Sequence, residues 1–137
     1  MQKVQARGRL RKPPIHLTDA DYDVIADLAL RMEQRLPELS KTILDEIDRA
    51  RVHPAGKLPK DVVTLGSEVE FLDDTTATRR RVQLVLPGDA NIEENRISVM
   101  TPVGAGLIGM SVGREISWPC PDGRPRILKI LEVKQQP

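Results

Sequence analysis

The sequence predicts a protein of the α+β class: an N-terminal antiparallel helical hairpin, in effect a short coiled coil, followed by an antiparallel β module with one short helix. Two observations carry this prediction. Apolar residues recur at helical spacing up to about residue 50, and from residue 62 onward they alternate along short segments bounded by Pro and Gly. The 137 residues suit one ordinary domain or two very small units that share a core.

Residues 1–14 are basic and polar and end in two consecutive prolines. Because little of this segment can be buried, we expect a flexible basic tail that aids solubility or makes a weak contact with nucleic acid. The segment lacks the apolar run of a signal peptide, and no stretch of the chain approaches the roughly 18 consecutive apolar residues of a membrane span. With Cys120 as the only cysteine, we expect a cytoplasmic protein that does not bind a membrane.

The helical hairpin is predicted over residues 15–56. Thr18 is placed to cap the first helix, with Asp21 three residues later in the acidic position of a capping box. Pro37 interrupts the apolar pattern, and a second helical pattern follows at once and stops before His53. Two amphipathic helices with so short a connection pack antiparallel, and about 15 residues in each give a hairpin about 22 Å long. The apolar positions are Val24, Ile25, Leu28, Met32 and Leu36, then Leu39, Ile43, Leu44, Ile47 and Ala50.

The β module is predicted over residues 57–137. Its strands alternate between apolar and polar residues, and Pro102 favours the first turn of a short helix over residues 102–108. A Pro-Asp-Gly turn at residues 121–123 separates the last two strands. The predicted strands cover residues 62–65, 68–72, 81–86, 96–100, 115–118 and 126–133.

Composition narrows the classes of function. Aromatic residues make up only 2% of the chain and the net charge is +1, which disfavours a base-stacking surface or a general polyanion-binding surface. His16 and His53 lack the further ligands that a zinc site needs. We predict no catalytic residue, metal site or cofactor, and we expect no small-molecule substrate.

Residues 104–109 spell G-x-G-x-x-G after a predicted strand. A dinucleotide site also needs a βαβ unit and an acidic residue about 20 positions further on. The 28 residues that remain have the pattern of an antiparallel pair of strands. We therefore interpret the glycines as positions where the short helix packs closely on the sheet.

Two charged clusters allow more than one interpretation. Asp19, Asp23 and Asp27 form an i, i+4 ladder, which is either a solvated helix face or a docking surface for a basic partner. The arginine run at residues 79–81 either protects a strand edge with charge or contacts a phosphate or an acidic partner.

Three segments in the second half of the chain resemble the Gre/Rnk family of bacterial transcription factors. Residues 61–71, Asp-Val-Val-Thr-Leu-Gly-Ser-Glu-Val-Glu-Phe, are similar to the entry of the family's C-terminal domain. Residues 97–109 are similar to its S-P-x-x-x-x-L-x-G segment, and residues 112–116 stand where the family has V-G-D-x-V, with Arg114 in place of the Asp. Within the family, the S-V-M-x-P-V-G pattern and Trp118 followed by a P-x-G turn are closest to the Rnk type.

The resemblance covers about residues 14–136 and implies a coiled-coil hairpin followed by an FKBP-like domain. It also implies a partner, RNA polymerase, whose secondary-channel rim receives the C-terminal domain of these factors. The implied contacts fall at Met100, Thr101 and Pro102, with Val103 in the short helix behind them. The cleavage factors have Asp-Ser-Pro at these three positions, whereas Met is what Rnk-type members carry.

The hairpin departs from the cleavage factors, which use a long coiled coil to bring two tip carboxylates to the catalytic magnesium of the polymerase. The predicted hairpin is too short for that reach. Its tip, residues 31–41, carries a net positive charge and includes Glu33, Arg35 and Glu38, and a cationic tip is poorly suited to recruiting Mg²⁺. The resemblance therefore implies a non-enzymatic regulator that competes with Gre factors for the polymerase and regulates nucleoside diphosphate kinase only indirectly.

Two alternatives remain open at the level of the sequence. The FKBP-like fold is also that of peptidyl-prolyl isomerases, although their pockets are lined with aromatic side chains that this chain largely lacks. The basic tail and the arginine run at residues 79–81 are compatible with a weak DNA- or RNA-binding module, whose affinity falls as salt rises. The apolar stripe of the hairpin leaves the oligomeric state undetermined.

Overall fold

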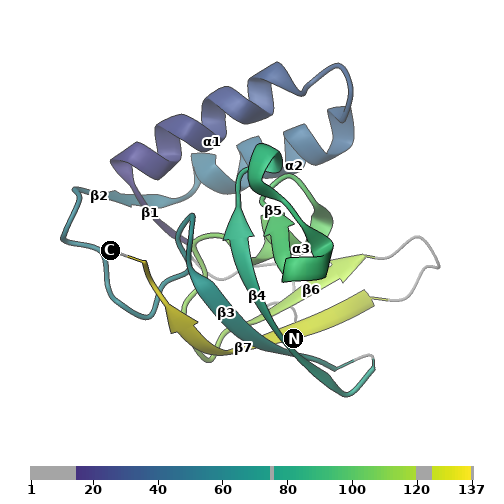
Figure 1. Cartoon of the computed structure of the whole chain (residues 1–137). Coiled ribbons are helices and arrows are strands. Elements are labelled where there is room, and N and C mark those ends of the chain that lie inside the picture. Colours follow the sequence, from purple (N-terminus) through teal and green to yellow (C-terminus); the bar gives the residue numbers. More distant parts are fainter. Residues whose placement is uncertain (1–14, 75, 120–124, 137) are drawn as a thin grey trace, which may run out of the picture.

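A computed structural model describes residues 15–74, 76–119 and 125–136. Within these ranges the chain forms three α-helices and two sheets, which confirms the α+β class (Figure 1). The predicted basic tail, Cys120 and the predicted turn at residues 121–123 lie outside the described residues.

Two consecutive helices, α1 (Asp19–Arg31) and α2 (Pro37–Asp48), form a pair in which α2 turns back alongside α1 (Figure 1). The hydroxyl of Thr18 accepts a hydrogen bond of 3.1 Å from the Asp21 N–H, as the capping pattern predicts, and a proline begins α2. The helices have 13 and 12 residues, so they are about 20 Å and 18 Å long and shorter than predicted. That this α1–α2 pair forms a coiled coil, and that the chain divides at residue 57, stay predictions.

The carboxylate of Asp21 does not complete the capping box. Instead it accepts a hydrogen bond of 3.1 Å from the N–H of Leu65, 44 positions away in sequence. Burial raises the pKa of Asp21, and the hydrogen bond from Leu65 opposes that rise. The start of α1 is thereby joined to the segment that leads into the main sheet.

A small parallel sheet flanks the α1–α2 pair and was not predicted. It pairs β1 (His16–Thr18) with β2 (Arg51–His53). The sequence pattern places residues 51–52 at the end of the second helix, but α2 ends at Asp48 and Arg51 donates its N–H to the Ile15 carbonyl at 2.9 Å. Strands of three residues are too short to show a periodicity, so the sequence pattern does not reveal them.

The main sheet has five strands in the order β5-β4-β3-β7-β6. Its antiparallel pairs are β3–β4, β3–β7 and β6–β7, whereas β4 and β5 are parallel, so the prediction of a wholly antiparallel module is wrong at this edge. A crossover through the 3₁₀ turns η3 (Pro87–Asp89) and η4 (Ile92–Glu94) brings the chain back beside residue 83, so that β5 runs in the same direction as β4. The strands are β3 (Glu68–Asp73), β4 (Thr78–Val85), β5 (Arg96–Ser98), β6 (Glu115–Pro119) and β7 (Pro125–Lys134).

The predicted strand at residues 62–65 is also wrong. Only Val62 makes a β-bridge, to Ser111, and the chain then turns. The Ser67 hydroxyl accepts a hydrogen bond of 2.9 Å from the Thr64 N–H, and the Ser67 N–H donates to the Thr64 carbonyl at 3.0 Å. Local hydrogen bonds of this kind compete with sheet pairing, even in a segment of β-branched residues.

The α1–α2 pair and the main sheet share one buried core. Ile25 and Ile43 from the two helices belong to the same cluster of buried side chains as Phe71 of β3 and Leu107 of the third helix, α3 (Pro102–Leu107). Phe71 is the largest fully buried side chain of the described residues. The helix pair is therefore packed on the β module, as Figure 1 also shows, and this packing limits its movement.

The glycines of the G-x-G-x-x-G run serve packing, as the sequence predicts. A Cβ atom on Gly104 would lie 2.1 Å from the Ser98 carbonyl oxygen and 2.9 Å from the Val99 Cα atom. Gly109 has a φ of 79°, and a Cβ there would lie 2.8 Å from the Cβ of Ile15. These two glycines let α3 and its exit lie directly against β5 and β1.

We predict that Gly104→Ala destabilises the fold severely, because the added methyl group overlaps backbone atoms that cannot move independently. The expected loss in the free energy of unfolding is about 3 kcal/mol or more. Gly88→Ala is the matched control, since a Cβ at Gly88 meets nothing within 4 Å. Urea unfolding of both variants measures the difference, and equal stability of the two would contradict the close packing of α3 on β5.

Candidate partner-binding surface

The segment predicted to contact a partner, residues 100–103, is only partly accessible. Met100 is 5% exposed and belongs to the core, whereas Pro102, the first residue of α3, is exposed. Thr101 and Val103 are half-buried. Pro102 is thus the member of this segment that a partner reaches without rearrangement of the fold.

Hydrogen bonds fix the backbone around Pro102. The Thr101 hydroxyl donates to the Ser98 carbonyl at 2.7 Å and accepts from the Gly104 N–H at 3.1 Å, which caps α3. The Ser98 hydroxyl accepts from the Met100 N–H at 2.9 Å. The Ser and Thr of the S-V-M-T-P motif therefore hold the segment in shape, and Pro102 is presented on a rigid turn.

The turn between α1 and α2 carries the residues predicted at the tip. Glu33, Arg35 and Glu38 are exposed, and no ion pair within 4 Å links them to another described residue. Two cations of the predicted tip, however, each form an ion pair with an aspartate one helical turn away. Arg31 lies 2.9 Å from Asp27, and Lys41 lies 3.1 Å from Asp45.

These two ion pairs change the electrostatic interpretation of the tip. The positive excess counted over residues 31–41 disappears when the two paired aspartates are included. Exposed pairs of this kind add little stability, but they lower the local field of the cations. The tip is a mixed-charge surface rather than a cationic one.

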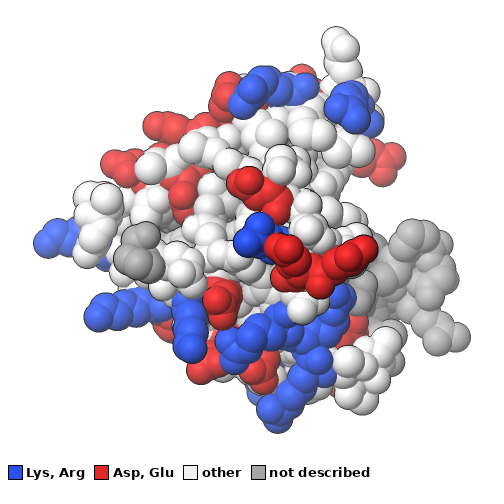
Figure 2. Space-filling view, in the orientation of Figure 1, with Lys and Arg blue, Asp and Glu red and all other residues white. Residues whose placement is uncertain are grey.

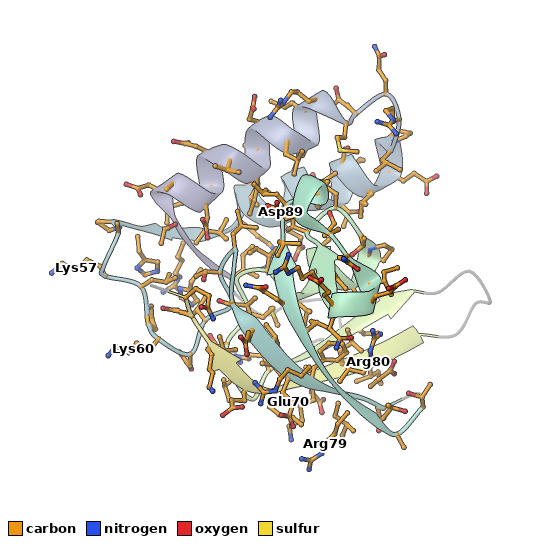
Figure 3. The ribbon with its side chains drawn as sticks, viewed as in Figure 1. Lys57, Lys60, Glu70, Arg79, Arg80 and Asp89 are labelled. Atoms are coloured by element: carbon orange, nitrogen blue, oxygen red, sulfur yellow. The ribbon has the colours of Figure 1, made fainter. Side chains whose placement is uncertain are left out.

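The arginine run at residues 79–81 lies on β4 and is largely engaged within the sheet. Arg81 donates to Glu70 of β3 at 2.8 Å and to Glu132 of β7, and Arg79 lies 3.6 Å from Glu70. The hydrogen bond from Arg81 lowers the pKa of Glu132. Figure 3 shows Arg79 and Glu70 together below the sheet, with Arg80 apart from them.

This placement bears on both interpretations of the arginine run. Because β5 pairs only with residues 83–85 of β4, the arginine-bearing part of β4 has no neighbouring strand on that side among the described residues, which fits protection of a strand edge by charge. Two of its three cations already face glutamates, so a phosphate site here receives no support from the structure.

The two histidines meet between β1 and β2. The Nδ1 atom of His16 and the Nε2 atom of His53 are 3.0 Å apart, and the ring centroids are separated by 5.2 Å. Burial lowers the pKa of His16, and the neighbouring His53, Arg51 and Arg114 lower it further, while Asp61 opposes them. The sequence does not predict that the two histidines meet, because their meeting depends on the parallel pairing of β1 with β2.

No group of three or more His, Cys, Asp or Glu side chains in the described ranges is arranged to hold a metal ion. In the same part of the chain, none of the helices is both long enough and apolar enough to cross a membrane.

Comparisons with known proteins identify relatives. Residues 58–135 match the family model described as the C-terminal part of the transcription elongation factors GreA and GreB. The regulator of nucleoside diphosphate kinase from Escherichia coli K12 is 33% identical over 93% of this chain and 94% of its own length. The transcription elongation factor GreA of Azorhizobium caulinodans is 34% identical over 85% of this chain and 71% of that factor. A solved GreA/GreB elongation factor from Nitrosomonas europaea superposes with a TM-score of 0.72 and 31% identity, over 90% of this chain and all of the other.

We predict that acidification destabilises the fold through His16. Because the pKa of His16 is below its ordinary value of 6.5, the unfolded chain binds more protons than the folded one as pH falls through that value. The free energy of unfolding is therefore fully maintained above about pH 6.5 and declines below it. Urea unfolding at pH 7.5 and pH 5.5 measures the decline, which should be smaller in His16→Gln. An equal decline in the variant and the wild type would contradict this assignment.

Proposed function

The chain belongs to the family of GreA/GreB transcription elongation factors, and on that premise we propose that it regulates transcription by binding RNA polymerase at the secondary channel. The family assignment bears out the resemblance found in the sequence, including its Rnk-type pattern. The matched residues include every strand of the main sheet and the helix α3, which begins at Pro102.

The observation that carries the proposal is the shortness of the α1–α2 pair. We interpret this pair as the counterpart of the coiled-coil arm of the cleavage factors. Helices of 13 and 12 residues extend about 20 Å, and their apolar faces are buried in the core that they share with the sheet. Such an arm fills the entrance of a channel but does not reach a catalytic centre deep inside it.

Transcript cleavage is not part of the proposed activity. Glu33 and Glu38 are exposed at the tip, with Arg35 between them in sequence. A carboxylate pair that recruits Mg²⁺ needs an uncompensated negative charge and a fixed geometry, and a mixed-charge turn offers neither. The protein then acts by occupying a site that the cleavage factors also use, and any effect on nucleoside diphosphate kinase follows indirectly from altered transcription.

The docking contact is proposed at residues 100–103, with Pro102 as the exposed member. Met100 is buried in the core, and the Thr101 hydroxyl donates a hydrogen bond to the Ser98 carbonyl, so both hold the turn in place. Val103 is half-buried. A proline on a rigid turn adds contact area with little loss of conformational entropy on binding. Neither the isomerase nor the nucleic-acid alternative gains a specific observation: Phe71 is fully buried, and Arg79 and Arg81 are paired with glutamates.

We predict that the protein binds core RNA polymerase with a Kd in the low micromolar range or below at low salt, and that GreA displaces it. Pro102→Glu should weaken this binding about tenfold or more, because it places a charge at the centre of the contact. The fold should tolerate the change, since an acidic residue is favourable in the first turn of a helix. Fluorescence anisotropy of the labelled protein, titrated with polymerase, measures both effects.

Pro54→Glu is the matched control, because Pro54 is exposed and lies outside the segment 100–103. Its affinity should match that of the wild type. Absence of binding by the wild-type protein at micromolar concentrations would overturn the proposed function. Undiminished binding of Pro102→Glu would leave a polymerase-binding protein but remove the assignment of its docking contact.

A further inference from the structure

The crossover between β4 and β5 carries the most exposed of the large apolar side chains in the described ranges. Residues 86–95 form this crossover, and neither η3 nor η4 buries a residue within it. Ile92, the first residue of η4, is 82% exposed. Single apolar side chains are common on protein surfaces, so the exposure alone has no functional meaning.

The loop that presents Ile92 is fixed by hydrogen bonds rather than by burial. Asn91 and Arg96 exchange two backbone hydrogen bonds of 2.9 Å, and the Asn91 side chain accepts from the Glu93 N–H at 3.0 Å. Asn95 has a φ of 58°, a left-handed conformation that Asn tolerates well, and donates its N–H to the Ile92 carbonyl at 3.0 Å. A partner that covers Ile92 therefore does not have to order the loop first.

The surroundings of Ile92 are acidic. Asp89, Glu93 and Glu94 are exposed, and Arg96, the cation that follows the crossover in sequence, lies 3.5 Å from Glu94. Figure 2 shows acidic side chains gathered over this part of the surface, and Figure 3 labels Asp89 there. An anionic rim repels the phosphates of nucleic acids and anionic lipids, whereas it attracts Lys and Arg side chains on a protein.

We propose that Ile92 and its acidic neighbours form a second docking point, which inserts the isoleucine into an apolar pocket rimmed by Lys or Arg on the polymerase. This inference rests on the proposed function and adds a contact to it. Apolar insertion supplies the affinity, and the acidic rim supplies the orientation and speeds the encounter.

The position of Ile92 suits a contact made together with Pro102. Asn91 bridges Arg96 at the first residue of β5, and the Thr101 hydroxyl bonds the carbonyl of Ser98 at its last. Three residues of strand span only about 7 Å, so the loop that carries Ile92 and the turn that carries Pro102 adjoin opposite ends of one short strand. In the proposed complex, one partner surface of ordinary size, about 800 Å² on each side, covers both.

The test is the affinity of Ile92→Ser for core RNA polymerase, compared with that of Val52→Ser. Val52 is a second exposed apolar residue, on β2 and outside both proposed contacts. Ile92→Ser should raise Kd about tenfold or more, and Val52→Ser should leave it within about twofold of the wild type. Urea unfolding should give the same stability for Ile92→Ser and the wild type, because the side chain is not buried.

Glu93→Lys provides an independent measurement. It reverses one charge of the rim without touching the apolar contact, so it should lower the association rate constant and weaken the dependence of that rate on salt. Unchanged affinity of Ile92→Ser, or equal losses in Ile92→Ser and Val52→Ser, would overturn the inference while the proposed function stands. Absence of polymerase binding by the wild type would overturn both.

Discussion

The burial of the α1–α2 pair against the main sheet is the constraint on which the rest of the structure depends. Two isolated helices of 12 or 13 residues are marginal in water, because helix nucleation is costly and few hydrogen bonds repay it. Ile25 and Ile43 gain stability by entering the cluster that contains Phe71, and each such side chain contributes about 1.5–3 kcal/mol. The bond from Leu65 to Asp21 and the β1–β2 pairing fix the orientation of the pair. The helices are therefore short and held in place.

That constraint links the fold to the proposed function. A long, free coiled coil reaches far into a channel, whereas a short pair that is buried along one face places its tip at a set distance from the sheet. The same core also supports α3, whose close approach to β5 requires Gly104 and presents Pro102 at its start. In the proposed complex, the tip of the helix pair and the docking residues are thus held by one core, so the protein binds as a preorganised body.

Local signals made much of the fold predictable. Thr18 and Pro37 mark the starts of the two helices, and the alternation along β3 and β4 identifies the centre of the sheet. Contacts between residues that are far apart in sequence were not predictable. The parallel pairing of β1 with β2, the bond of Asp21 to Leu65 and the bond of Arg81 to Glu132 join residues that are 35, 44 and 51 positions apart. The bond of Arg81 to Glu70 joins two different strands, 11 positions apart. At the candidate site, the motif located Pro102, but only the structure separates it from the buried Met100 and reveals the exposure of Ile92.

The most direct test of the central claim is a transcript-cleavage assay on backtracked elongation complexes of RNA polymerase. We predict that this protein alone releases no RNA fragments beyond the intrinsic level, and that it suppresses GreA-stimulated cleavage in proportion to its concentration. Stimulation of cleavage by the protein alone would contradict the claim that the short α1–α2 pair, with its mixed-charge tip, does not support cleavage. Unchanged GreA-stimulated cleavage at saturating concentrations of the protein would contradict occupancy of the shared site.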